Sequence, residues 1–131
     1  MEPLLTGTAL SMPTHLTVRN ATRDQELGHR VILADTRWLR LRGMMGRPEP
    51  SPGEGMLLHP CRGVHMFWMK YPLDVVFLDE EGRVVALYRE LGPWTRSRVH
   101  RGARYALELP VGTIAGTEIE EGDLLNWEVS S

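Results

Sequence analysis

The chain has 131 residues, of which 42% are hydrophobic and 24% are charged, a balance typical of one globular domain and unlike that of a disordered or fibrous protein. Its 15 basic and 17 acidic side chains leave a formal net charge of -2, so the molecule as a whole has no positive field that would hold a polyanion, and a nucleic-acid partner would need a local basic patch. The one cysteine, Cys61, excludes an internal disulfide.

The amino-terminal segment, residues 1–14, contains Pro3, Gly7 and Pro13 and has no sustained periodicity, so we expect a poorly ordered leader before a single domain at 15–131. The segment lacks the basic and apolar regions of a secretory signal. Nowhere does the sequence approach the roughly 18 consecutive apolar residues of a membrane span. We therefore expect a cytoplasmic protein without a membrane partner.

The first predicted elements are two strands and a helix. Residues 16–20 and 30–34 are strand candidates, and Asp35 or Thr36 can cap a helix of about two turns. Apolar positions recur every three to four residues along this helix and predict its buried side: Trp38, Leu41 and Met45. The basic side is expected to be solvated and carries Arg37, Arg40 and Arg42, with Arg47 just beyond.

From residue 55 onward the pattern favours strands. Runs rich in β-branched, aromatic and aliphatic residues are found at 56–58, 64–69, 73–78 and 83–89. Residues 79–82 supply turn chemistry, which predicts an antiparallel hairpin over 73–89. Alternation predicts a half-buried strand over 104–109 whose inner residues are Tyr105, Leu107 and Leu109. A last strand follows Gly122, with Leu125, Trp127 and Val129 facing inward.

These elements predict a mainly β (α+β) fold. We expect seven or eight short strands in a compact, barrel-like or sandwich-like antiparallel sheet, with one or two short helices. Glu108 points away from Leu107 and Leu109, so it is either a solvated charge, which we favour, or one wall of a ligand pocket.

Asp74 is predicted to be a buried acid. It shares a strand face with Val76 and Leu78, in a segment whose two faces are both apolar. An ionised carboxylate there must be paired or hydrogen-bonded, so we predict a neighbouring cation. The available cations are Arg42, Lys70, Arg47 and Arg83, of which Arg42 and Lys70 are preferred. A structural ion pair and a binding role both remain open.

A short cluster of potential ligands, His59, Cys61 and His65, could offer nitrogen and thiolate groups to a transition metal. Pro60 and Gly63 interrupt the run, and the chain has no further cysteine, so we predict neither a metal site nor a cofactor. Cys61 could take its base from either histidine, but nothing completes a triad. We assign no catalytic residue.

The motifs of the chain resemble those of the domain of unknown function 192 family, from about residue 37 to residue 129. The segments that carry the resemblance are 42–47, 55–57, 64–79, 107–112 and 122–123. The resemblance implies a compact β-rich fold with short helices and no established activity. It also implies a shared pocket, whose candidate residues are Arg42, His65, Phe67, Met69, Lys70, Asp74 and Glu108.

Three functions remain in competition. We favour a non-catalytic binding domain for a small or extended ligand, either a small molecule or a peptide. The first alternative is a hydrolase-like enzyme that uses His65 with Asp74 or Glu108 as acid and base. The second is a protein or nucleic-acid interaction module that uses the basic residues of 37–47 or 96–104, although the net charge argues against nucleic acid. The sequence leaves the oligomeric state open.

Overall fold

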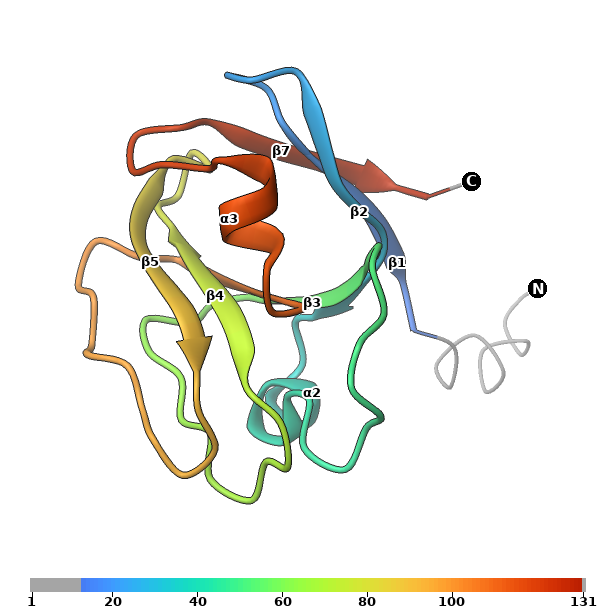
Figure 1. Ribbon diagram of the computed structural model, residues 1–131, viewed down its shortest axis with the longest axis vertical. Coiled ribbons are helices and arrows are strands. Elements are labelled where there is room, and N and C mark those ends of the chain that lie inside the picture. Colours follow the sequence, from blue (N-terminus) through green and yellow to red (C-terminus); the bar gives the residue numbers. More distant parts are fainter. Residues whose placement is uncertain (1–12, 131) are drawn as a thin grey trace.

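The computed structural model describes residues 13–130 and shows a curved seven-stranded sheet with two short helices (Figure 1). In chain order the elements are β1 (His15–Asn20), β2 (Gln25–Ala34), α2 (Arg37–Arg42), β3 (Glu54–Leu58), β4 (Leu73–Leu78), β5 (Val84–Leu91), β6 (Tyr105–Leu109), α3 (Thr113–Thr117) and β7 (Leu125–Val129). The predicted mainly β class with short helices is confirmed. Residues 1–12 of the predicted leader lie outside the described residues. Neither of the described helices has the length and apolar character that a membrane crossing requires.

The strand order is β5-β4-β6-β3-β2-β1-β7. Every neighbouring pair is antiparallel except β2 and β3, which are parallel. The connection through α2 carries the chain back along the sheet, so that β3 runs in the same direction as β2. The sheet is therefore mixed, not antiparallel throughout as the sequence predicted. Arg83 and Leu124 form an isolated bridge between the two outer parts of the sheet, but no ladder of described residues closes it into a barrel.

The hairpin predicted over residues 73–89 is confirmed, because β4 and β5 pair antiparallel. In its turn, a side-chain oxygen of Asp79 accepts hydrogen bonds from the backbone N–H groups of Glu81 and Arg83, both at 2.9 Å. Gly82 has a φ of 94° and lies against the backbone carbonyl of Leu125, so a side chain would be strained and would collide there.

The strand predicted over residues 64–69 is wrong. This segment turns, with the backbone N–H of Met69 donating to the carbonyl of Met66 at 3.3 Å, and its one sheet-like contact is a bridge from His65 to Arg96. Trp68 has a φ of 68°, which ends any extended run. The apolar residues of this segment belong to a loop, and two of them, Met66 and Met69, are buried in the core and hold the loop in place.

Two hydrophobic clusters occupy the two faces of the central strands. The first contains residues of all seven strands and is covered by α3, which contacts both β2 and β5 (Figure 1). The second lies on the other face of β3, β4 and β6 and includes Met44, Met56, Met66, Met69 and Phe77. Because both faces of β6 are buried, alternation over 104–109 does not separate a buried side from a solvated one.

Helix α2 has about the predicted length but faces the other way. The hydroxyl of Thr36 accepts a hydrogen bond from the backbone N–H of Leu39 at 3.1 Å, and Gly43 ends the helix. Trp38 is 65% exposed and Leu41 is 64% exposed, so the predicted buried side was wrong. Leu39 packs against the second cluster instead. On β7, likewise, Leu125 is buried but Val129 is exposed.

Candidate functional site

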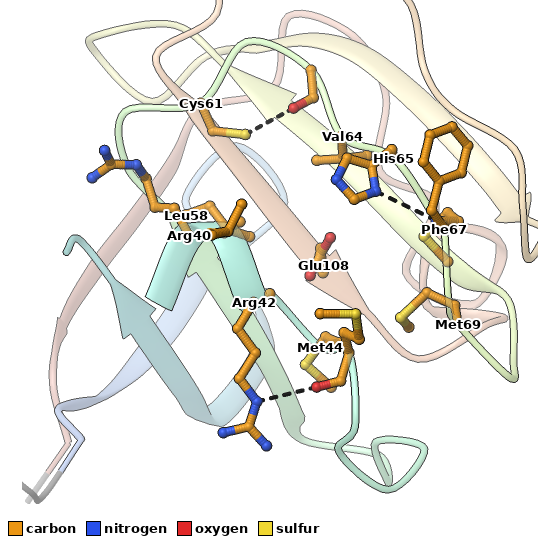
Figure 2. Close-up of a pocket in the computed structure, with 15 residues that line it drawn as sticks. Arg40, Arg42, Met44, Leu58, Cys61, Val64, His65, Phe67, Met69 and Glu108 are labelled. Carbon is orange, nitrogen blue, oxygen red and sulfur yellow. Dashed lines mark hydrogen bonds between the residues drawn. The ribbon is translucent and has the colours of Figure 1, made fainter. Parts of the chain in front are cut away.

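A small cavity opens between α2, the segment that follows it, the loop before β4 and strand β6 (Figure 2). Its volume is about 80 Å³. The residues that line it are Arg40, Leu41, Arg42, Gly43, Met44, Met45, Leu58, Cys61, Gly63, Val64, His65, Met66, Phe67, Met69 and Glu108. Aliphatic and sulfur-containing side chains form most of the wall, and a few charged or polar groups converge on it, as in many small-molecule sites.

Glu108 is the acid of this cavity. It is only 5% exposed, and burial raises its pKa from 4.5 to about 7. Its Oε1 atom has no hydrogen-bond partner among the described residues. Figure 2 shows the carboxyl group at the centre of the lining side chains. A partly protonated carboxyl group therefore faces the cavity near neutral pH, and our preference for a solvated Glu108 was wrong.

The sheet places Glu108 here through two close approaches. In the β3–β6 pair, Glu108 lies opposite Met56. The preceding residue, Gly55, lies so close to the backbone carbonyl of Glu108 that a Cβ would collide with it. Gly43, at the end of α2, has no side chain to fill the space above the carboxyl group, where a Cβ would lie 3.8 Å from Oε1. The first glycine lets β3 approach the backbone of Glu108, and the second leaves the space above its carboxyl group open.

Two arginines of α2 stand at the rim of the cavity without pairing with the acid. The Nε of Arg42 donates to the carbonyl of Met45 at 3.1 Å, and Nη1 of Arg40 donates to the carbonyls of Asp35 and His59 at 3.2 and 3.3 Å. In the described part of the chain, no salt bridge joins either arginine to Glu108. On the predicted solvated basic side of the helix, Arg37 is exposed, whereas Arg40 and Arg42 are half-buried and make the mouth of the cavity positive.

Aromatic rings continue from one wall of the cavity across the surface. His65 stacks on Phe67 with centroids 4.8 Å apart, Phe67 lies 6.1 Å from Trp94, and Trp94 meets Trp68 edge to face at 4.8 Å. We call these four side chains the aromatic ridge. Trp94 was missed by the sequence analysis, because only the fold brings its loop against residues 65–68.

Lys70 lies beside the cavity. It lines a second hollow together with Trp68, Tyr71 and Arg47, and this hollow shares Met44, Met45 and Met69 with the first. Five of the seven candidate residues, Arg42, His65, Phe67, Met69 and Glu108, therefore line one cavity, and Lys70 lines its neighbour.

Asp74, the last candidate, lies elsewhere. It is 1% exposed, so its predicted burial is confirmed. Its Oδ1 accepts a hydrogen bond from the backbone N–H of Glu90 at 3.0 Å, and its Oδ2 accepts one from that of Ile114 at 2.8 Å. The predicted neighbouring cation is wrong, because two backbone donors from β5 and α3 satisfy the carboxylate.

The potential metal ligands are engaged separately. His59 stacks on Tyr105 at 4.5 Å, His65 stacks on Phe67, and the thiol of Cys61 donates to the carbonyl of Gly63 at 3.1 Å. Across residues 13–130, no three histidine, cysteine or acidic side chains gather as a metal site would require. Burial raises the pKa of the Cys61 thiol, which makes it a poor nucleophile.

Comparison with known proteins gives the family. The model of DUF192, a family described as an uncharacterized ACR, matches residues 18–127. The chain belongs to the DUF192 family. This confirms the resemblance found in the sequence, and the matched residues include the whole cavity.

Relatives and solved structures of this DUF192 chain agree with that assignment. The UPF0127 protein of Thermococcus sibiricus is 38% identical over 117 residues, covering 84% of this chain and 73% of its own length. The UPF0127 protein of Pyrococcus furiosus is 33% identical over 111 residues, covering 82% and 95%. A protein of unknown function from Novosphingobium aromaticivorans has a TM-score of 0.74 at 25% identity, covering 86% and 83%. A putative transcription regulator from Sinorhizobium meliloti has a TM-score of 0.72 at 27% identity, covering 88% and 94%.

Proposed function

We propose that this chain is a non-catalytic binding domain whose cavity takes a small ligand that donates a hydrogen bond to Glu108. The observation that carries the proposal is the unpartnered Oε1 atom of a carboxyl group that is only 5% exposed. A buried polar group without a partner costs about 1–3 kcal/mol, which a ligand donor recovers on binding. The methionine and aliphatic walls supply the apolar contact that such a ligand also needs.

The size of the cavity limits the ligand. A cavity of about 150 Å³ accommodates benzene, whereas this one measures about 80 Å³. The group that enters is therefore a short tip of a few atoms that ends in an amine, a hydroxyl or an amide N–H. The rest of the ligand lies at the rim, where Arg40, Arg42 and Phe67 favour a polar or anionic portion.

The test uses probes that match the tip alone. Purified protein labelled with ¹⁵N is titrated with methylammonium, ethanol and acetamide as donors, and with acetate as an acceptor-only control. We expect the donors to produce saturable shifts of the backbone amides of residues 43–45, 64–67 and 108. Acetate should leave the amide of residue 108 unshifted at a pH above 7, where it would face a carboxylate.

A matched pair of variants completes the test. Glu108→Met removes the acceptor at similar volume and should abolish the saturable shifts, whereas Glu128→Met, on the exposed face of β7, should leave them unchanged. The proposal is wrong if none of the donors shifts the amides of the cavity, or if Glu108→Met binds them as the wild type does.

One observation favours a second candidate, a hydrolase-like enzyme. His65 lines the same cavity as Glu108, and a carboxyl group with a pKa of about 7 suits proton transfer at neutral pH. In this account Asp74 has no catalytic part, because its oxygens are engaged by backbone donors. A panel of ester, amide and glycoside substrates tests it. Turnover that His65→Gln and Glu108→Gln each abolish supports the enzyme, and an absence of such turnover rejects it.

A further inference from the structure

Three hollows meet around residues 63–70. The first is the cavity above Glu108, and the second contains Lys70 and Arg47. The third is lined by Arg62, Arg96 and Arg98, and it shares Gly63, Val64, His65 and Phe67 with the first. Because the second also shares residues with the first, the first hollow adjoins both of the others.

This surface is strongly basic. Each hollow contributes at least two cationic side chains, and among the described residues that line them the only acid is Glu108, which is buried. Acidic residues gather instead in the β4–β5 turn at 79–82 and in the segment 118–123, which Figure 1 shows at the end of the molecule away from α2. The net charge of -2 therefore conceals the local basic patch that a polyanionic partner requires.

The aromatic ridge runs between the hollows. Trp68 is 68% exposed and Trp94 is 57% exposed, which is unusual for side chains of this size. Both have positive φ values, 68° and 66°, a backbone conformation that bulky residues rarely adopt. Two backbone hydrogen bonds hold the ridge in place, from Trp94 N–H to the carbonyl of Met66 at 2.8 Å and from Met66 N–H to the carbonyl of Thr95 at 2.7 Å.

We propose that the aromatic ridge and the basic hollows beside it bind single-stranded nucleic acid. The bases stack on Trp68 and Trp94, and the phosphates lie against Lys70 and the arginines of the hollows. Interleaved rings and cations along a hollowed surface are the means by which proteins hold single strands without sequence preference. A flat anionic bilayer does not reach into the hollows, and an acidic peptide supplies charge without flat rings. The site does not use Glu108 and stands independently of the small-ligand proposal.

The experiment measures binding of fluorescently labelled oligothymidine and oligouridine of about 15 nucleotides, near the upper end of the roughly 4–16 nucleotides that a small single-strand site covers. We expect binding at low ionic strength that weakens steeply as salt is added, together with quenching of tryptophan fluorescence. Trp68→Ala and Trp94→Ala should each weaken binding by about 5- to 150-fold, the usual range for loss of one stacked base. Arg96→Glu should also weaken it, whereas Arg83→Glu, beside the acidic turn at 79–82, should not.

Two further variants and two other anionic partners make the outcome decisive. Trp68→Phe keeps an aromatic face and should retain most of the binding that Trp68→Ala loses, provided that melting temperatures show both variants to be folded. Glu108→Met should bind the oligonucleotides as the wild type does, so this proposal and that for the cavity can fail separately. The proposal is overturned if the oligonucleotides do not bind at low ionic strength, if Trp68→Ala binds as the wild type does, or if polyglutamate or anionic phosphatidylglycerol vesicles bind equally well.

Discussion

Asp74 and Glu108 lie one register step apart on adjacent strands, and their side chains leave the sheet on opposite faces. In the β4–β6 pair, Asp74 lies opposite Leu109 and Glu108 lies opposite Val75. Leu109 belongs to the cluster beneath α3, whereas Val75 belongs to the cluster that contains the methionines of the cavity. Both acids are buried, but one is satisfied by backbone donors and the other is not.

The first prediction concerns Asp74. Asp74→Ala leaves the buried backbone N–H of Ile114 and the part-buried N–H of Glu90 without an acceptor, and we expect it to lower the free energy of unfolding by about 3 kcal/mol. Asp74→Asn keeps one acceptor oxygen and should cost less. Chemical denaturation measures both values. A loss below about 1 kcal/mol for Asp74→Ala, within the range of ordinary surface changes, would contradict a structural role.

The second prediction concerns the pH dependence of stability. The unfolded chain ionises Glu108 near the ordinary pKa of 4.5, whereas the folded chain holds the proton up to about pH 7. Between these values the native state binds more protons than the unfolded state, so the free energy of unfolding falls as the pH rises. The loss is complete above pH 7 and amounts to about 3 kcal/mol.

Glu108→Gln isolates this contribution from that of other titrating groups. The variant cannot ionise at position 108, so the stability difference between the wild type and the variant should shift with pH over the same window. Urea denaturation at several pH values measures that difference. A difference that stays constant from pH 4.5 to above 7 would show that the folded carboxyl group titrates normally.

The third prediction concerns Gly43. Its φ of 54° and ψ of -134° at the end of α2 favour glycine, so Gly43→Ala should cost about 1–3 kcal/mol in stability. Its Cβ would also stand 3.8 Å from Oε1 of Glu108 and narrow the cavity. We therefore expect weaker binding of ethanol and acetamide than of the smaller methylammonium, measured by the same amide shifts. Unchanged binding of all three probes would place the ligand elsewhere.

Much of the fold was predictable because most strands carry their own local signal. Turn chemistry at 79–82 predicted the hairpin, and apolar runs predicted the central strands. The parallel pairing of β2 and β3 has no such signal, because it depends on how α2 and the following loop return the chain. Residues 64–69 turn where a strand was predicted, because an apolar run predicts burial whether the backbone is extended or turned.

The sequence predicted which residues line the cavity better than it predicted the burial and the hydrogen-bond partners of those residues. The family motifs brought forward five residues that share the cavity, among them Arg42, His65 and Glu108. Alternation on β6 suggested a solvated Glu108, because it cannot show that α2 and the loops cover the second face. The partners of Asp74 are backbone groups, which every residue possesses and which no sequence pattern identifies. Trp94 joins the ridge only through tertiary contact.

The ¹³C chemical shift of the Glu108 carboxyl carbon, followed across a pH titration of the folded protein, tests the account most directly. A buried and unpartnered carboxyl group facing the cavity predicts a titration midpoint of about 7 that falls when methylammonium is added. A midpoint near the ordinary value of 4.5, unmoved by the amine, would mean that the group is hydrated or already paired, and would contradict the account.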